Sequence, residues 1–331
     1  MAAMHWNALI VPNHRASIEP MPDGAPRPTW SVMIPTYHCA VYLRQTLRSV
    51  LTQAPGPETM QIEVIDDAST LDDPEAVVRE VGGGRVEFFR QSINVGHIRN
   101  FETCLRRARG YYVQLLHGDD FVLPGFYAAL QRGFESNPAI GAAFSRWMLV
   151  NGSGECLSVV DAEQPNAGPL ADAVRRLSEE QHIVTPSIAV RRSVYERLGG
   201  FDDRLRCSED WEMWVRIAAS HPIWYEPSTL AAYRSHANSN TGRHYRLAQE
   251  FRYTAKAIEI FGAYLPREHA LSIKRKARRT YAQAALQNAR KFGESGDARA
   301  MRAHLGAALR LSREPGMLLQ VARLLSRIVR R

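Results

Sequence analysis

The first 255 residues of this 331-residue chain contain no lysine. A phosphate-binding P-loop requires the sequence Gly-Lys-Ser/Thr, so this part of the chain has none. Cysteine is also sparse. The four cysteines lie far apart and lack the spacing of a metal site. We therefore expect reduced thiols in a cytoplasmic protein. No apolar run approaches the roughly 18 residues that a membrane-spanning helix needs.

Positive charge is concentrated in the C-terminal third. Residues 250–331 carry 18 Lys or Arg and 6 Asp or Glu, a net charge of +12, and the rest of the chain carries −4. Five of the six residues 274–279 are basic. Apolar residues here follow helical periodicity only, with breaks near Pro266, residues 293–296 and Pro315. We expect residues 246–331 to form a basic helical region of three or four helices.

Residues 29–245 alternate between strand and helix patterns. Strands are predicted over 30–35, 61–65, 85–90 and 111–116, and helices follow over 41–53, 74–81, 97–108 and 124–135. This order predicts an α/β fold with a mostly parallel sheet flanked by helices. Later elements are a strand at 140–149, a helix at 170–180, a short helix over 190–200, a helix after Ser208 and edge strands at 223–225 and 230–233. Residues 1–28 lack periodicity and are expected to form a flexible arm.

Pairs of carboxylates follow two of the predicted strands. Asp66 and Asp67 follow the second strand, and Asp119 and Asp120 follow the fourth. The carboxyl ends of parallel strands meet at the edge of the sheet where ligands bind. Adjacent carboxylates repel each other unless water or a cation neutralises them, and Mg²⁺ takes such hard oxygen ligands. The alternative is a solvated Asp-Asp turn.

Five motifs occur in a fixed order: 32–37 (Val-Met-Ile-Pro-Thr-Tyr), 64–69 (Val-Ile-Asp-Asp-Ala-Ser), 94–96 (Asn-Val-Gly), 117–120 (His-Gly-Asp-Asp, followed by Pro124) and 209–211 (Glu-Asp-Trp). Over about residues 30–241 the chain resembles the inverting nucleotide-sugar glycosyltransferases of family 2, which have the GT-A fold. The resemblance implies a hexosyltransferase that moves a sugar from a UDP- or dTDP-sugar donor to an acceptor hydroxyl. It also implies a Mg²⁺ or Mn²⁺ cofactor, a saccharide or lipid-linked acceptor, and a role in bacterial surface polysaccharide or glycolipid synthesis.

The resemblance also implies roles for matching positions. Asp67 is expected to hydrogen-bond the nucleotide base, and Asp210 to be the catalytic base. Asp119 and Asp120 stand at the metal-binding Asp-x-Asp motif, whose first Asp is replaced by His117. His236 is expected to make a further contact with the metal or the diphosphate. The nucleotide-binding positions are Pro35, Thr36, Tyr37, Asp67, Asn94, Gly96 and Asp119.

Each of these roles has a simpler alternative. Asp210 lies in a first helical turn, where a carboxylate is favoured by the helix dipole alone. His236 can be an ordinary surface histidine, and Trp211 and Trp214 can pack the core rather than stack on sugar. The catalytic reading requires that acids distant along the chain converge on one crevice.

The C-terminal segment 317–331 reads as a basic amphipathic helix, with apolar Leu318, Val321, Leu325 and Ile328 among arginines. Such a helix lies on an anionic membrane surface or docks on a neighbouring helix. The first case would place the enzyme on the inner face of the membrane, and no nucleic-acid partner is expected. Two alternatives for the whole chain are a non-catalytic membrane- or nucleic-acid-binding module and a sugar nucleotidyltransferase. The latter class opens with a Gly-rich loop where residues 35–38 here read Pro-Thr-Tyr-His.

Overall fold

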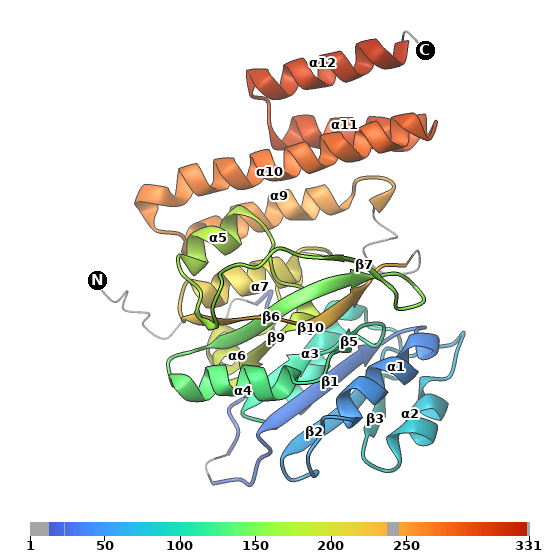
Figure 1. Cartoon of the computed structure of the whole chain (residues 1–331), viewed down its shortest axis with the longest axis vertical. Coiled ribbons are helices and arrows are strands. Elements are labelled where there is room, and N and C mark those ends of the chain that lie inside the picture. Colours follow the sequence, from blue (N-terminus) through green and yellow to red (C-terminus); the bar gives the residue numbers. More distant parts are fainter. Residues whose placement is uncertain (1–12, 23, 237–244, 330–331) are drawn as a thin grey trace. The chain divides into compact units, whose positions relative to one another are not determined.

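A computed structural model describes residues 13–22, 24–236 and 245–329. The chain forms two compact units, which are described separately (Figure 1). The first comprises Met1–Ala171, Ile183–Arg204 and Ser220–Arg234, and the second comprises Asp172–His182, Leu205–Ala219 and Ser235–Arg331.

The first unit is built on one mixed sheet. Its strand order is β3-β2-β1-β4-β9-β6-β10-β5. The pairs β3/β2, β2/β1, β1/β4 and β6/β10 are parallel, and β4/β9, β9/β6 and β10/β5 are antiparallel. The strands are β1 (Trp30–Thr36), β2 (Met60–Asp66), β3 (Glu87–Arg90), β4 (Tyr112–Leu115), β5 (Phe121–Val122), β6 (Ala142–Val150), β7 (Cys156–Val159), β8 (Gly168–Pro169), β9 (Ile188–Arg191) and β10 (Ile223–Arg234).

Helices pack on this sheet as the predicted α/β architecture requires. Alternate residues of β1, such as Val32 and Ile34, join a core with Leu43 and Leu47 of α1. This contact forms because a strand repeats every two residues and a helix every 3.6. The helical segments of this unit are α1 (Ala40–Leu51), α2 (Pro74–Gly82), α3 (His97–Arg107), α4 (Phe126–Ser136), η1 (Thr185–Ser187) and α6 (Arg192–Leu198).

Two predicted elements are wrong. The helix expected from residue 190 begins only at Arg192, because residues 188–191 form strand β9 between β4 and β6. The two expected edge strands are one strand, β10, that lies between β6 and β5. Pro227 lies between the two predicted segments, and the register shift after Glu226 accommodates it within the strand.

Part of the segment before β1 packs against the rest of the first unit, so the expected flexible arm is corrected for residues 14–19. Ile18 is buried. The Arg192 guanidinium donates to the Glu19 carbonyl at 3.0 Å, and His14 lies 3.2 Å from the Asp202 carboxylate. Residues 1–12 and 23 lie outside the described residues.

The second unit is helical, and its described part contains four α-helices after residue 246, where three or four were expected. Among the described residues it also takes in α5 and α7 from within residues 29–245. Leu286, Met301, Leu305 and Val321 contribute to its core. The helical segments are α5 (Ala173–Glu179), α7 (Glu209–Ala218), α9 (Glu250–Phe261), η2 (Gly262–Tyr264), α10 (Arg267–Glu294), α11 (Ala298–Leu311) and α12 (Pro315–Val329).

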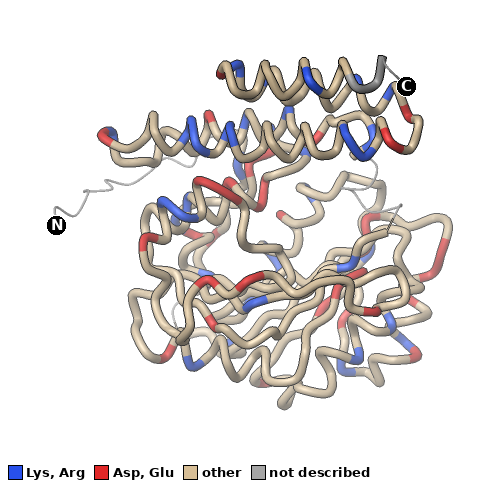
Figure 2. Tube along the Cα trace, turned by 45° about the horizontal axis from the view of Figure 1, so that its top comes forward, with Lys and Arg blue, Asp and Glu red and all other residues tan. Residues whose placement is uncertain are grey.

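Basic residues are interspersed with fewer acidic residues along the helices of the second unit (Figure 2). In the cluster 274–279, four side chains form ion pairs with carboxylates of the same unit: Lys274 and Arg278 with Glu259, Arg275 with Glu314, and Lys276 with Glu179. These pairs offset much of the local charge that a nucleic-acid surface would need. Within the described ranges, no helix combines the length and apolar character required to cross a bilayer.

Candidate active site

The nucleotide-site candidates gather at the carboxyl end of β1. Pro35 and Thr36 end this strand. The Asp67 amide, just after β2, donates to the Thr36 carbonyl at 2.9 Å, and the Gly118 amide, after β4, donates to the Pro35 carbonyl at 3.0 Å. The loops that carry the two acidic pairs therefore flank β1 at the edge of the sheet where the sequence predicted a site.

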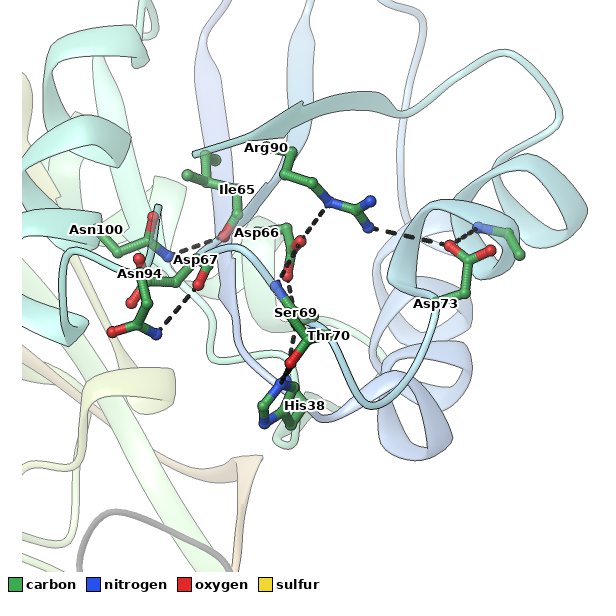
Figure 3. Close-up of polar contacts among 11 residues, drawn as sticks. His38, Ile65, Asp66, Asp67, Ser69, Thr70, Asp73, Arg90, Asn94 and Asn100 are labelled. Carbon is green, nitrogen blue, oxygen red and sulfur yellow. Dashed lines mark hydrogen bonds and ion pairs between the residues drawn. The ribbon is translucent and has the colours of Figure 1, made fainter. Parts of the chain in front are cut away.

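Asp66 shapes the loop after β2. Its buried carboxylate accepts bonds from the Ser69 hydroxyl at 2.5 Å, the Ser69 amide at 3.1 Å and the Arg90 Nε at 2.7 Å (Figure 3). With both oxygens engaged, Asp66 has a structural role.

Asp67 holds the 94–96 segment against the same loop. Its Oδ1 accepts from the Val95 amide at 2.7 Å, and its Oδ2 from the Gly96 amide at 3.0 Å. The Asn94 side chain donates to the Asp67 carbonyl at 3.1 Å (Figure 3). Burial raises the pKa of Asp67, and the two amide bonds oppose that rise. The predicted bond to the base stays a prediction, and the structure adds a role in shaping the loop.

Tyr37 presents an aromatic ring beside these loops. It is 37% exposed, and its ring stacks on His38 with 3.8 Å between centroids. His38 is tied to the loop after β2, because its Nε2 accepts from the Thr70 amide at 3.0 Å and its own amide donates to the Ser69 hydroxyl at 2.9 Å. His38 therefore fixes the ring that the family resemblance places against the nucleotide.

His117, Asp119 and Asp120 form a group of potential metal ligands. One ligand atom from each lies within 4.8 Å of the others. Asp120 is buried, and its Oδ2 lies 3.5 Å from His117 Nδ1. Burial and the adjacent Asp119 carboxylate raise the pKa of Asp120 to about 6, as expected for acids crowded together without a cation.

This donor set fits a divalent cation. Within the described part of the chain, Asp120 Oδ2 is buried and accepts no hydrogen bond. The group includes His117, which the sequence marked only as a departure from the motif. His236 belongs to the second unit, so its contact with metal or diphosphate stays a prediction.

The loop that carries these ligands is tightly packed. A Cβ at Gly118 would lie 2.2 Å from Thr36 Oγ1 and 2.8 Å from Cys39 Sγ, so only glycine fits. The Thr46 hydroxyl of α1 lies 3.1 Å from the Gly118 carbonyl and 2.7 Å from the Asp120 carbonyl. These contacts set the spacing between His117 and Asp119.

Arg234 is a supporting residue that the sequence analysis missed. It ends β10 and is buried. Its amide donates to Asp120 Oδ1 at 2.7 Å, and its Nε donates to the Asp119 carbonyl at 2.6 Å. The sequence placed Arg234 in a polar tail, and no local pattern links it to acids more than 110 residues earlier.

The proposed base, Asp210, lies in the first turn of α7 in the second unit. Ser208 occupies the N-cap position as expected, but its side chain makes no capping bond and lies 3.3 Å from the Thr254 hydroxyl. Asp210 Oδ2 accepts a hydrogen bond from the side-chain Nε2 of Gln181 at 2.7 Å. Trp211 and Trp214 are buried, which confirms their packing role. The role of Asp210 as base, and its convergence with Asp67 and Asp119, stay predictions.

The sequence model of glycosyl transferase family 2 matches residues 31–199. An uncharacterized protein of Mycobacterium tuberculosis is 30% identical over 229 residues, which are 66% of this chain and 70% of that protein. An uncharacterized glycosyltransferase of Methanocaldococcus jannaschii is 24% identical over 59% of this chain and 66% of its own length.

Two solved structures share the fold. S. aureus TarS 1–349 in complex with UDP-GlcNAc gives a TM-score of 0.66 at 15% identity, covering 84% of this chain and 79% of that one. The mannosyltransferase PcManGT from Pyrobaculum calidifontis, in complex with GDP-Man and Mn²⁺, gives a TM-score of 0.57 at 19% identity. The match covers 92% of this chain and 83% of that one. The fold and the family match define a GT-A glycosyltransferase. The chain belongs to glycosyl transferase family 2.

Proposed function

We propose that this enzyme is a metal-dependent inverting glycosyltransferase that moves a sugar from a UDP- or dTDP-sugar to an acceptor hydroxyl. The observation that carries the proposal is the His117, Asp119 and Asp120 group beside the end of β1, within the region matched by the family. Family membership also sets aside the non-catalytic module and the sugar nucleotidyltransferase.

Each residue group has a distinct task in this reaction. The 35–37 segment and the loop shaped by Asp67 bind the nucleoside. His117, Asp119 and Asp120 would hold Mg²⁺ or Mn²⁺, which when bound offsets the charge that the leaving diphosphate gains. Asp210 takes the proton of the acceptor hydroxyl while that oxygen attacks the anomeric carbon, and the bond to the diphosphate breaks. One displacement with one base inverts the anomeric centre, and such proton transfer typically contributes 10²–10⁴-fold in rate.

A donor panel tests this proposal. Purified enzyme is incubated with UDP-, dTDP- and GDP-sugars, with and without Mn²⁺, and nucleotide release is measured. We expect release from a UDP- or dTDP-sugar that needs the cation and that falls at least 100-fold in Asp210→Asn, with donor affinity unchanged. Full turnover by Asp210→Asn, or equal release in chelator, would contradict the proposal.

We also propose that the acceptor is saccharide or lipid-linked and that α12 brings the enzyme to an anionic membrane surface. The predicted single apolar face is corrected: Met317 and Val321 are buried, whereas Leu318, Leu319 and Leu325 are 43–53% exposed. Ile328 belongs to residues 327–329, whose side chains are not described. The exposed leucines on a helix of a basic region are the feature that supports membrane contact.

Vesicle sedimentation tests this contact. The triple change of Leu318, Leu319 and Leu325 to glutamate should release the protein from vesicles of phosphatidylglycerol and phosphatidylcholine. The control is Leu271→Glu on α10, since Leu271 is 82% exposed outside α12. Equal vesicle binding by wild type and the triple variant, or equal loss in the control, would refute the assignment to α12.

A further inference from the structure

Asp210 is held by a hydrogen bond from outside its own helix. Gln181, in the segment after α5, donates its Nε2 to Asp210 Oδ2 at 2.7 Å. Asp210 Oδ1 accepts from the Trp211 amide at 2.8 Å. Both carboxylate oxygens therefore accept a hydrogen bond, which restricts the side chain and favours its charged form.

Gln181 is in turn held by the C-terminal helical region. Its backbone amide donates to the Tyr281 hydroxyl of α10 at 3.1 Å. Burial raises the pKa of Tyr281, so this hydroxyl stays neutral. A neutral tyrosine can accept the amide bond without adding a charge beside Asp210.

The residue next to Asp210 is fixed by the same helices. The Trp211 indole donates to the Leu177 carbonyl of α5 at 2.5 Å. The centroid of its ring lies 4.8 Å from the ring centroid of Phe261 of α9 and 5.0 Å from that of Tyr281. The first turn of α7 therefore has its orientation set by α5, α9 and α10.

From these contacts we infer that Gln181 is the positioning residue of the catalytic base, and that Tyr281 extends this support into the C-terminal helices. The inference rests on the proposed role of Asp210. It gives the region after residue 246, which carries no catalytic motif, a part in the reaction.

The pH dependence of kcat/KM tests the inference, because a structural role alone would not move it. In Gln181→Met the carboxylate loses the donor that favours its charged form, so the acid limb should move up by about one pH unit with little change in donor KM. Gln181→Glu should move it further, since a like charge stands beside Asp210. Tyr281→Phe keeps the ring and removes the hydroxyl, and should give a smaller shift in the same direction.

The other groups near Asp210 are unchanged in these variants, apart from the Tyr281 hydroxyl in Tyr281→Phe. Those that Asp210 affects electrostatically are Cys207, just before α7, and Tyr281 of α10; Glu209 and Glu250 act on Cys207, and Glu180 acts on Tyr281. A matched control is Gln131→Met, since Gln131 also donates to a carboxylate, that of Glu135 on α4, at 2.8 Å. Its acid limb should stay at the wild-type position.

Thermal unfolding and circular dichroism check that each variant is folded. If Gln181→Met does not fold, the pH profile of Tyr281→Phe tests the inference instead. An acid limb unmoved in both variants, while Asp210→Asn loses turnover, would overturn this inference and leave the proposed function standing. Full activity of Asp210→Asn would instead remove the proposed function itself.

Discussion

Replacement of Arg234 by lysine would show how far the metal-ligand loop depends on one buried side chain. Arg234 is 2% exposed. Its guanidinium donates to the carbonyls of Asp119 at 2.6 Å, Asn151 at 3.2 Å and Gly152 at 2.9 Å, and to Gln45 Oε1 at 2.7 Å. These acceptors come from three separate segments, so one planar cation joins the loop after β4, the turn after β6, and α1.

The expected cost follows from the acceptors that lysine cannot reach. An ammonium group is a single point donor, whereas the guanidinium is a rigid fork. If two of the four part-buried acceptors lose their donor, at up to about 1–3 kcal/mol each, the free energy of unfolding of the first unit falls by up to about 2–6 kcal/mol. The Asp119 carbonyl would then be less constrained, and Mn²⁺ affinity should fall about tenfold, as for lost outer-shell partners of metal ligands.

Two measurements separate stability from metal binding. Urea unfolding gives the change in stability, and the EPR signal of free Mn²⁺ gives the dissociation constant without donor or acceptor. The control is Arg191→Lys, because Arg191 also donates to two carbonyls, of Ile140 at 2.6 Å and Phe134 at 2.7 Å, and lies over two aromatic rings. Arg191→Lys should lose stability and keep its Mn²⁺ affinity. If Arg234→Lys behaves the same way, Arg234 does not position the ligands.

Three further predictions follow from single contacts. Gly118→Ala places a Cβ 2.2 Å from a buried threonine hydroxyl, so it should cost about 1–3 kcal/mol of unfolding free energy and most of the turnover; wild-type activity would show that the loop can shift freely. Asp67→Asn sets an NH₂ group against one of the two backbone amides of residues 95 and 96. The affinity for UDP, measured by calorimetry, should fall about tenfold, as expected for about 1.4 kcal/mol of lost loop stability. Unchanged affinity would contradict this. Burial raises the pKa of Glu250 to about 7. The folded state therefore keeps a proton that the unfolded state loses near the ordinary pKa of 4.5. As a result, the stability of the helical unit should fall by about 2–3 kcal/mol between pH 4.5 and 8. Glu250→Gln should remove this decline in thermal melts, and an identical pH profile would refute the assignment.

Periodicity and turn chemistry predicted most of the sheet and its helices. Apart from the two-residue strand β5, which was not predicted, the β1 to α4 order follows directly from alternating apolar patterns and from carboxylates at strand ends. Strand β9 could not be found this way, because it is a four-residue run that pairs with β4, more than 70 residues earlier. Strand β10 was predicted as two edge strands, whereas the structure continues pairing through Pro227, with register shifts between Glu226 and Ala231.

The candidate site shows the same division between local and distant information. Asp119 and Asp120 follow a recognisable strand, so their place at the sheet edge was predictable. The part that Gln181 plays depends on a contact with Asp210, 29 residues later. The packing of His14 and Glu19 depends on Asp202 and Arg192, whose positions are known only after the sheet has formed.

The interleaving of the two units has a consequence for engineering this enzyme. The helical unit draws on three separate segments, so the chain passes between the units five times. A single cut cannot remove the helices after residue 246 without stripping α7 of the partners that surround it. Exchange of the C-terminal helices with those of a relative should therefore include residues 172–182 and 205–219 as well.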